Sequence, residues 1–102
     1  MIRVVIEHKI KGPEYVDKAI ELTREKRTEV MKQPGFIAGE TLINAKDPTD
    51  MLVIHTWENM ETWDAWDKRK EKAQMNARIN KVLAEPFKAR VYENPKKSKK
   101  KG

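Results

Sequence analysis

The sequence predicts a single α+β domain whose elements follow the order strand, helix, strand, strand, helix, strand. Three observations predict it. The length of 102 residues is that of one ordinary domain. Apolar and polar residues alternate in the first segment, as in a half-buried strand. Gly and Pro residues then separate stretches with the period of a strand from stretches with the period of a helix.

The first strand and the first helix are expected over residues 1–11 and from Pro13 to about Gln33. Along the strand Ile2, Val4, Ile6, His8 and Ile10 share one face, and Arg3, Val5, Glu7 and Lys9 share the other. Pro13 suits the first turn of a helix, and Pro34-Gly35 ends it. The expected apolar stripe of this helix is Val16, Ala19, Ile20, Thr23, Val30 and Met31. The charges expected on its solvent side are Arg24, Lys26, Arg27 and Lys32.

A hairpin and two helical segments follow. Strands are expected over residues 36–45 and 51–57, with a turn at 47–50. Asn59 is a predicted helix N-cap, which begins a helix running to about residue 70. A second helical segment over residues 71–84 carries Ala73, Ala77, Ile79, Val82 and Leu83 and ends before Pro86; residues 87–92 form the last strand. This order is the split βαβ arrangement of the ferredoxin-like fold, with a four-stranded antiparallel sheet.

Two helices can cover only one face of such a sheet, yet several strands carry apolar residues on both faces. Ile37 and Ile43 alternate with Phe36 and Leu42, and Val53 and Trp57 alternate with Leu52 and Ile54. The uncovered face needs a partner. A second copy supplies it most simply, so we expect a homodimer in which two sheets pack face to face.

Charge and cysteine content exclude several classes of protein. Residues 94–102 carry five of the 22 lysines and arginines, which leaves 17 bases against 16 acids in the rest of the chain. We therefore expect a domain over residues 1–93 and a disordered Lys-rich tail over 94–102, with no specific nucleic-acid partner. The absence of cysteine excludes disulfides, thiolate catalysis and Cys-ligated metals. No apolar run approaches a signal peptide or a membrane span, so we expect a cytoplasmic protein without membrane insertion.

Two short motifs resemble the antibiotic biosynthesis monooxygenase (ABM) superfamily. The first is Pro34-Gly35-Phe36, and the second is Trp57-Glu58 followed nine positions later by Trp66. In that superfamily a helix ends at a Pro-Gly-Phe turn, and a strand ending in Trp-Glu leads into a helix that carries a key pocket residue. The resemblance implies a dimeric α+β barrel for residues 1–93 and places Trp66 at the pocket.

Five residues are candidates for the site. Trp66 and His8 are the catalytic candidates, because an indole packs against a planar substrate and a histidine titrates near neutral pH. Both have a purely structural interpretation as core residues. Trp63, Met75 and Asn76 are candidate substrate-binding residues. His55 is a weaker candidate, because its strand face is the possible dimer surface. In haem-degrading members of the superfamily the haem-ligating histidine falls at Met75 or Asn76, so the resemblance makes that ligation doubtful here.

Three functions remain open from the sequence. The first is a small monooxygenase that acts on an aromatic, phenolic or quinone-like molecule without a bound metal or other cofactor. The second is a haem-binding or haem-degrading protein with altered ligation. The third is a non-catalytic dimeric module that binds a small apolar ligand.

Overall fold

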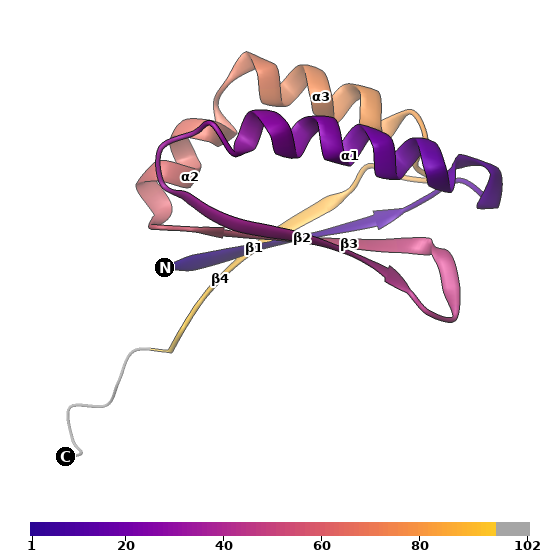
Figure 1. The fold of residues 1–102 in the computed structure, drawn as a ribbon, viewed down its shortest axis with the longest axis horizontal. Helices are drawn as coiled ribbons and strands as arrows, with labels where there is room; N and C mark the ends of the chain where they lie inside the picture. The colour runs from indigo at the N-terminus through magenta and orange to yellow at the C-terminus, as the bar shows by residue number, and fades with distance from the viewer. Residues whose placement is uncertain (96–102) are drawn as a thin grey trace.

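The computed structural model describes residues 1–95 and confirms the predicted fold class. The predicted Lys-rich tail lies almost wholly outside the described residues. The elements are β1 (Ile2–Lys9), a short 3-10 helix η1 (Pro13–Tyr15), α1 (Val16–Val30), β2 (Phe36–Asn44), β3 (Asp47–Trp57), α2 (Met60–Asp67), α3 (Lys70–Asn80) and β4 (Lys88–Glu93) (Figure 1).

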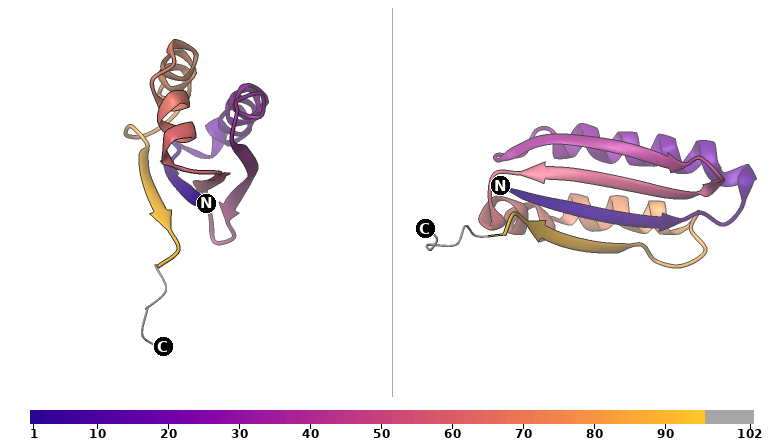
Figure 2. Two further views of the ribbon diagram at one scale, coloured as in Figure 1. Left: turned by 90° about the vertical axis from the view of Figure 1, so that its left-hand side faces the viewer. Right: turned by 90° about the horizontal axis from the view of Figure 1, so that it is seen from below.

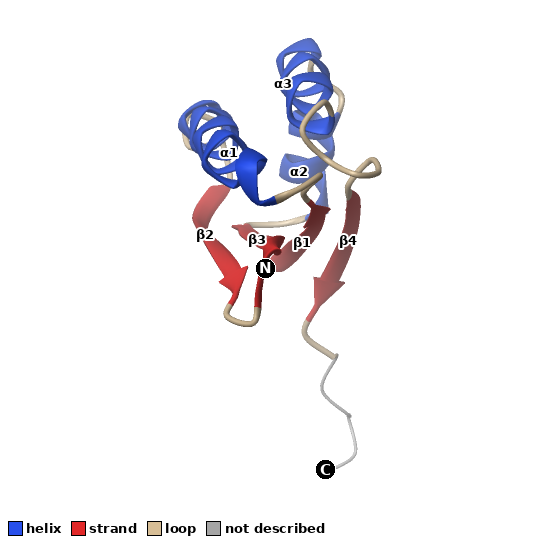
Figure 3. Cartoon of the chain, turned by 90° about the vertical axis from the view of Figure 1, so that its right-hand side faces the viewer, coloured by secondary structure: helices blue, strands red, loops and turns tan. Residues whose placement is uncertain are grey.

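The four strands form one antiparallel sheet in the order β2-β3-β1-β4. Seen from below, the strands lie side by side with the helices behind them (Figure 2). A view from the end shows all three helices on one side of the sheet (Figure 3). The sheet therefore has one face covered by helices and one open face, as the sequence predicts.

The hairpin turn comes earlier in the chain than the sequence predicts. It consists of residues 45–46, and residues 47–50 extend β3 instead of forming the turn. The side chain of Asn44 closes the turn by accepting a hydrogen bond from the backbone amide of Lys46 at 2.8 Å. Residues 47–50 have the composition of a turn, but the end of β1 gives them partners: Asp50 lies opposite Lys9 and forms a 3.1 Å ion pair with it.

The buried stripe of α1 differs from the predicted one: Leu22 and Lys26 join it, and Val16 and Ile20 are only half-buried. Met31 is exposed and caps the helix, and Lys26 is buried although it was expected on the solvent side. Lys26 lies three residues after Thr23 and four before Val30, so helical geometry places it on the same face as these two residues. The buried residues of the helix are Ala19, Leu22, Thr23, Lys26 and Val30.

A capping box fixes the start of α2, so the N-cap prediction at Asn59 is confirmed. The Asn59 side chain accepts a hydrogen bond from the Thr62 amide at 2.9 Å, and the Thr62 hydroxyl accepts one from the Asn59 amide at 3.4 Å. Gly35 packs against this first turn. Its φ is 86°, and a Cβ there would lie 2.4 Å from Thr62 Cβ, so the Pro-Gly turn requires glycine on both grounds.

The last helix ends earlier than predicted, at Asn80 instead of near residue 84. The following residues continue along the end of β1: the Lys11 amide donates to the Val82 carbonyl at 2.9 Å, and the Ala84 amide donates to the Lys9 carbonyl at 2.7 Å. These hydrogen bonds replace the helical ones that the apolar period had suggested.

Two hydrophobic clusters fill the space between the sheet and the helices. The first cluster consists of Ile2, Val4, Ile6, Val30, Val53, Trp57 and Trp66. The second consists of Ile10, Ala19, Leu22, Met51, Ile79, Val82 and Leu83. Phe87, just before β4, packs against both. Among the described residues, no helix is long and apolar enough to cross a membrane.

Candidate functional site

Four buried polar side chains lie on the inner side of the fold, and we call them the polar seam: His8, Thr23, Lys26 and His55. On β1, His8 comes between Ile6 of the first cluster and Ile10 of the second. On α1, Lys26 comes between Leu22 of the second cluster and Val30 of the first. The polar seam therefore lies between the two hydrophobic clusters, at the level where they meet.

The ring of Phe87 brings two members of the seam together. The His8 imidazole lies 5.3 Å from it between centroids, tilted by 44°. The ammonium nitrogen of Lys26 lies 4.9 Å from the same ring centroid. The two side chains come from the sheet and from the facing helix, and they are 1% and 4% exposed. The sheet and the helix therefore each place one basic side chain beside the same aromatic ring inside the protein.

Among residues 1–95, four buried side-chain polar atoms have no hydrogen-bond partner. They are His8 Nδ1, Arg27 Nε, Trp57 Nε1 and Asn76 Oδ1. Buried polar atoms are nearly always hydrogen-bonded, and leaving one without a partner costs about 1–3 kcal/mol. His8 Nδ1 and Trp57 Nε1 lie on the sheet, Arg27 Nε is a donor on α1, and Asn76 Oδ1 is an acceptor on α3.

Burial changes the protonation states of the seam. It lowers the pKa of Lys26 from its ordinary 10.5 to about 7, with repulsion from Lys72 adding to this effect and attraction to Asp67 opposing it. Burial, and after it repulsion from Lys26, lowers the pKa of His8 to about 4 and that of His55 to about 3. At neutral pH both histidines are therefore uncharged, and Lys26 is the group that changes charge.

The structure divides the sequence-predicted site residues among three places: the polar seam, the first hydrophobic cluster and α3. His8 lies in the polar seam. Trp66, 2% exposed, belongs to the first hydrophobic cluster, against which the half-buried Trp63 also packs. Met75 and Asn76 lie half-buried on α3, and Asn76 supplies one of the unpartnered atoms. Phe87 links the first two of these places, because it packs against the Trp66 cluster and contacts His8.

A pocket of about 340 Å³ lies beside the indole of Trp66, at the surface between the end of α1 and the face of α2. Its lining residues are Gln33, Pro34, Glu61, Thr62, Ala65, Trp66 and Arg69. His8, Trp63, Met75 and Asn76 do not line it. Trp66 is thus the candidate residue that reaches both this pocket and the buried core.

His55 lies on the helix-covered face, so the sequence-based suggestion that its face is the dimer surface is wrong. The register pairs His55 with Val4, and residues opposite each other in a sheet share a face. On the other side of His55, Gly39 leaves space for the imidazole, since a Cβ there would lie 2.9 Å from His55 Cδ2.

Lys26 is the residue of this interior that the sequence reasoning missed. Its spacing from Ala19, Thr23 and Val30 carried the signal, because positions seven, three and four residues apart share a helix face. The general expectation that a lysine in a charged helix is solvated outweighed that spacing.

The residues present do not fit haem in the manner of the haem-degrading enzymes. The two positions that correspond to the ligating histidine hold Met75 and Asn76, and the histidines of the chain are His8 and His55, both on the sheet. No group of three His, Cys, Asp or Glu side chains that could hold a metal ion occurs within residues 1–95.

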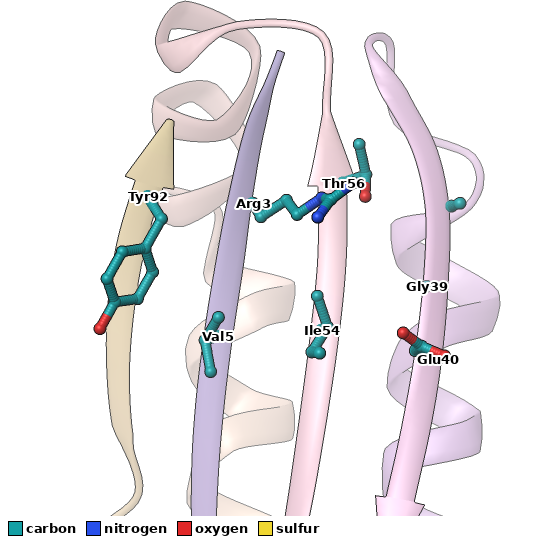
Figure 4. Close-up of a pocket in the computed structure, with 8 residues that line it drawn as sticks. Arg3, Val5, Gly39, Glu40, Ile54, Thr56 and Tyr92 are labelled. Atoms are coloured by element: carbon teal, nitrogen blue, oxygen red, sulfur yellow. The ribbon is translucent and has the colours of Figure 1, made fainter. Parts of the chain in front are cut away.

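The open face of the sheet carries a second pocket, of about 530 Å³. Figure 4 shows the side chains of Arg3, Val5, Ile54, Thr56 and Tyr92 on this face, with the helices behind the sheet. Apolar side chains on it are only partly covered: Val5, Leu52 and Ile54 are half-buried, and Leu42 and Tyr92 are exposed. This surface is separate from the polar seam.

Comparison with known proteins gave a family and a set of similar folds. The family model described as antibiotic biosynthesis monooxygenase matches residues 1–78. A crystal structure of an antibiotic biosynthesis monooxygenase is similar with a TM-score of 0.81 and 20% identity, covering 94% of this chain and 100% of that one. A conserved protein of Bacteroides thetaiotaomicron, described as a possible oxidoreductase, has a TM-score of 0.81, 25% identity and coverages of 91% and 96%. SnoaB, a cofactor-independent oxygenase from Streptomyces nogalater, has a TM-score of 0.83, 9% identity and coverages of 94% and 94%. No curated protein matches the sequence.

Proposed function

Because this chain belongs to the antibiotic biosynthesis monooxygenase family, we propose that it is an oxygenase acting on an aromatic phenol or quinol without a bound metal. The observation that carries the proposal is the polar seam, where the His8 imidazole and the Lys26 amine lie beside the ring of Phe87 in a buried, helix-covered interior. The description of SnoaB as a cofactor-independent oxygenase supports the same chemistry.

In this reaction the substrate is the source of all electrons. A quinol of naphthalene reacts with one molecule of dioxygen to give the hydroxylated quinone and one molecule of water. One oxygen atom enters the ring, the other leaves as water, and four electrons come from the quinol. The protein has to bind the substrate in a dry pocket, orient it and stabilise its oxidised form.

The candidate residues divide this work between them. Trp66, which lines the pocket beside α2, packs against the flat face of the substrate. Trp63 packs against the hydrophobic cluster that contains Trp66 and helps to hold the indole in place. His8 is uncharged at neutral pH because its pKa is about 4, so it serves as a hydrogen-bond partner of a substrate oxygen and not as its base. Asn76 Oδ1 accepts a hydrogen bond from a second polar group of the substrate.

The Trp66→Ala variant tests the proposed function. We expect it to weaken binding of a planar aromatic such as para-nitroanisole by about tenfold or more, because the stacking surface is lost. Oxygen consumption with a naphthalene quinol should fall with it. The Trp66→Phe variant keeps an aromatic ring and serves as the matched control. Retention of full affinity and turnover in Trp66→Ala, or failure of labelled dioxygen to deliver one atom to the product, would refute the proposal.

We also propose that the functional unit is a homodimer formed by the open faces of two sheets. The half-buried Val5 and Ile54 and the exposed Leu42 and Tyr92 lie on that face. Apolar side chains in such a patch lower the free energy when a second copy covers them.

The Ile54→Lys variant tests the dimer. A lysine in the middle of the buried interface would lose its hydration, so we expect a monomer where the unchanged protein is a dimer. Sedimentation equilibrium at several protein concentrations measures the mass. Met31→Lys, at an exposed apolar position on the C-cap of α1, is the control and should stay dimeric. A monomeric unchanged protein would contradict the proposal.

A further inference from the structure

The buried interior is basic and lacks a buried acid. Among residues 1–95 the buried polar or charged side chains are those of the polar seam, and none is a carboxylate. The charged groups that act on Lys26 are Lys72 on α3 and Asp67 at the end of α2, and Lys26 in turn acts on His8 of β1 and His55 of β3. Arg27, the next residue on α1, also acts on His55. Of these, only Asp67 is an acid, and it is exposed and forms an ion pair with Lys72.

Lys26 itself forms no ion pair within the described part of the chain. Its ammonium nitrogen faces the ring of Phe87, and the His8 imidazole, whose Nδ1 has no hydrogen-bond partner within residues 1–95, lies beside the same ring. A buried ammonium group is stable only when an opposite charge or hydrogen bonds compensate for the lost hydration. Within residues 1–95 no side chain supplies the anionic side of such a pair.

We propose that Lys26 binds the ionised oxygen of the substrate and takes up its proton, so that the substrate is an acidic phenol or enol bound as its anion. This assignment rests on the proposed function. The O–H bond of the substrate breaks, an N–H bond forms on the neutral Lys26 amine, and the resulting ammonium and oxyanion form a buried ion pair. The His8 imidazole, at the same ring of Phe87, adds a hydrogen bond to the oxygen or to its neighbour.

The protonation states agree with this assignment of roles. A general base works best when its pKa is close to the working pH. The pKa of Lys26 is about 7, whereas those of His8 and His55 are about 4 and about 3. An electron-rich anion also reacts with dioxygen more readily than the neutral phenol does. Lys26 therefore both favours substrates that can ionise and makes them more reactive toward dioxygen.

A pair of matched ligands tests the proposal. The phenol para-nitrophenol can ionise and is yellow as its anion, and para-nitroanisole has the same ring but no ionisable proton. We expect the bound phenol to show the anion spectrum at a pH where the free phenol is mostly neutral. Lys26→Met should abolish that spectrum and weaken phenol binding by about 10- to 100-fold while leaving anisole binding within about twofold.

Lys72→Met is the control for a long-range charge effect, because Lys72 also acts on Lys26 but forms its ion pair with Asp67. It should keep the anion spectrum. If Lys26→Met keeps that spectrum and affinity while both ligands bind, Lys26 is not the partner of the oxygen, and the proposed function survives. If neither ligand binds the unchanged protein, the proposed function fails and the role of Lys26 fails with it.

Calorimetry of the unchanged protein gives a second test that needs no variant. The bound pair holds one proton between Lys26 and the oxygen. Binding of para-nitrophenol should therefore release a proton to the buffer below about pH 7, where both free partners are protonated, and take one up above it. Titrations in two buffers of different ionisation enthalpy measure the proton count. Proton exchange of constant sign across this range would overturn the proposal.

Discussion

Lys26→Met is expected to make the protein more stable at neutral pH, although it removes a residue of the proposed site. Methionine has a similar length and no charge, so it fills the space between the two hydrophobic clusters without the cost of burying an amine. Each unit by which burial lowers the pKa corresponds to about 1.4 kcal/mol, so we expect a gain of a few kcal/mol. Urea unfolding followed by circular dichroism, at one fixed protein concentration, measures it.

The pH dependence of the stability provides a second measurement of the same effect. Between about pH 7 and 10.5 the unfolded chain keeps the proton of Lys26 and the folded chain has lost it, so the stability of the unchanged protein rises with pH over that window. Lys26→Met should abolish that rise. The rise between about pH 3 and 6.5 should remain, because it comes from His8 and His55, whose pKa values are lowered mainly by burial.

Two results would contradict this account. The first is a variant less stable than the unchanged protein at pH 7, which would mean that Lys26 contributes more through contacts than its burial costs. The second is an unchanged slope between pH 7 and 10.5. Arg24→Met, at an exposed position on the same helix, is the control and should leave both stability and slope nearly unchanged.

Trp57→Ala is expected to cause the largest loss of stability. Trp57 is 0% exposed at the end of β3, and its ring packs edge-on against Phe36 with centroids 5.4 Å apart. Truncating a buried tryptophan to alanine costs about 3–5 kcal/mol, because burial is lost and a cavity remains. In a domain of this size that loss lowers the Tm by more than about 10 °C. Thermal unfolding followed by far-ultraviolet circular dichroism measures it.

Trp57→Phe separates the ring from its N–H group. Nε1 of Trp57 has no hydrogen-bond partner in the part of the chain that the structure describes, so removing it should cost far less than removing the ring. We expect the phenylalanine variant to lie much closer to the unchanged protein than to Trp57→Ala. Equal losses in the two variants would mean that the N–H group is hydrogen-bonded in solution.

The fold could be predicted from the sequence because its signals are local. Alternation along β1, the breaks at Gly12-Pro13 and Pro34-Gly35, and the N-cap at Asn59 each depend on residues close together in the chain. The hairpin turn was misplaced because residues 47–50 have the composition of a turn, and several of their partners come from the distant end of β1. The order of the elements was therefore more predictable than their ends.

The site was less predictable because it depends on contacts between distant segments. His8 and Trp66 could be selected by residue type and by resemblance to a family. The burial of Lys26 depends on the packing of α1 over β1 and on Phe87, more than 60 residues away in the chain. The strand pairing that places His55 on the inner face also becomes visible only once β3 is aligned with β1.

The capping box that joins β3 to α2 has a consequence for the evolution of this segment. Because α2 starts directly after β3, the direction in which the Trp66 indole points depends on the number of residues between Trp57 and Trp66. Adding or deleting one residue within the helix before Trp66 would turn the indole by about 100° around the helix axis and point it away from the sheet. Changes of length are therefore far less tolerable in this segment than changes of side chain.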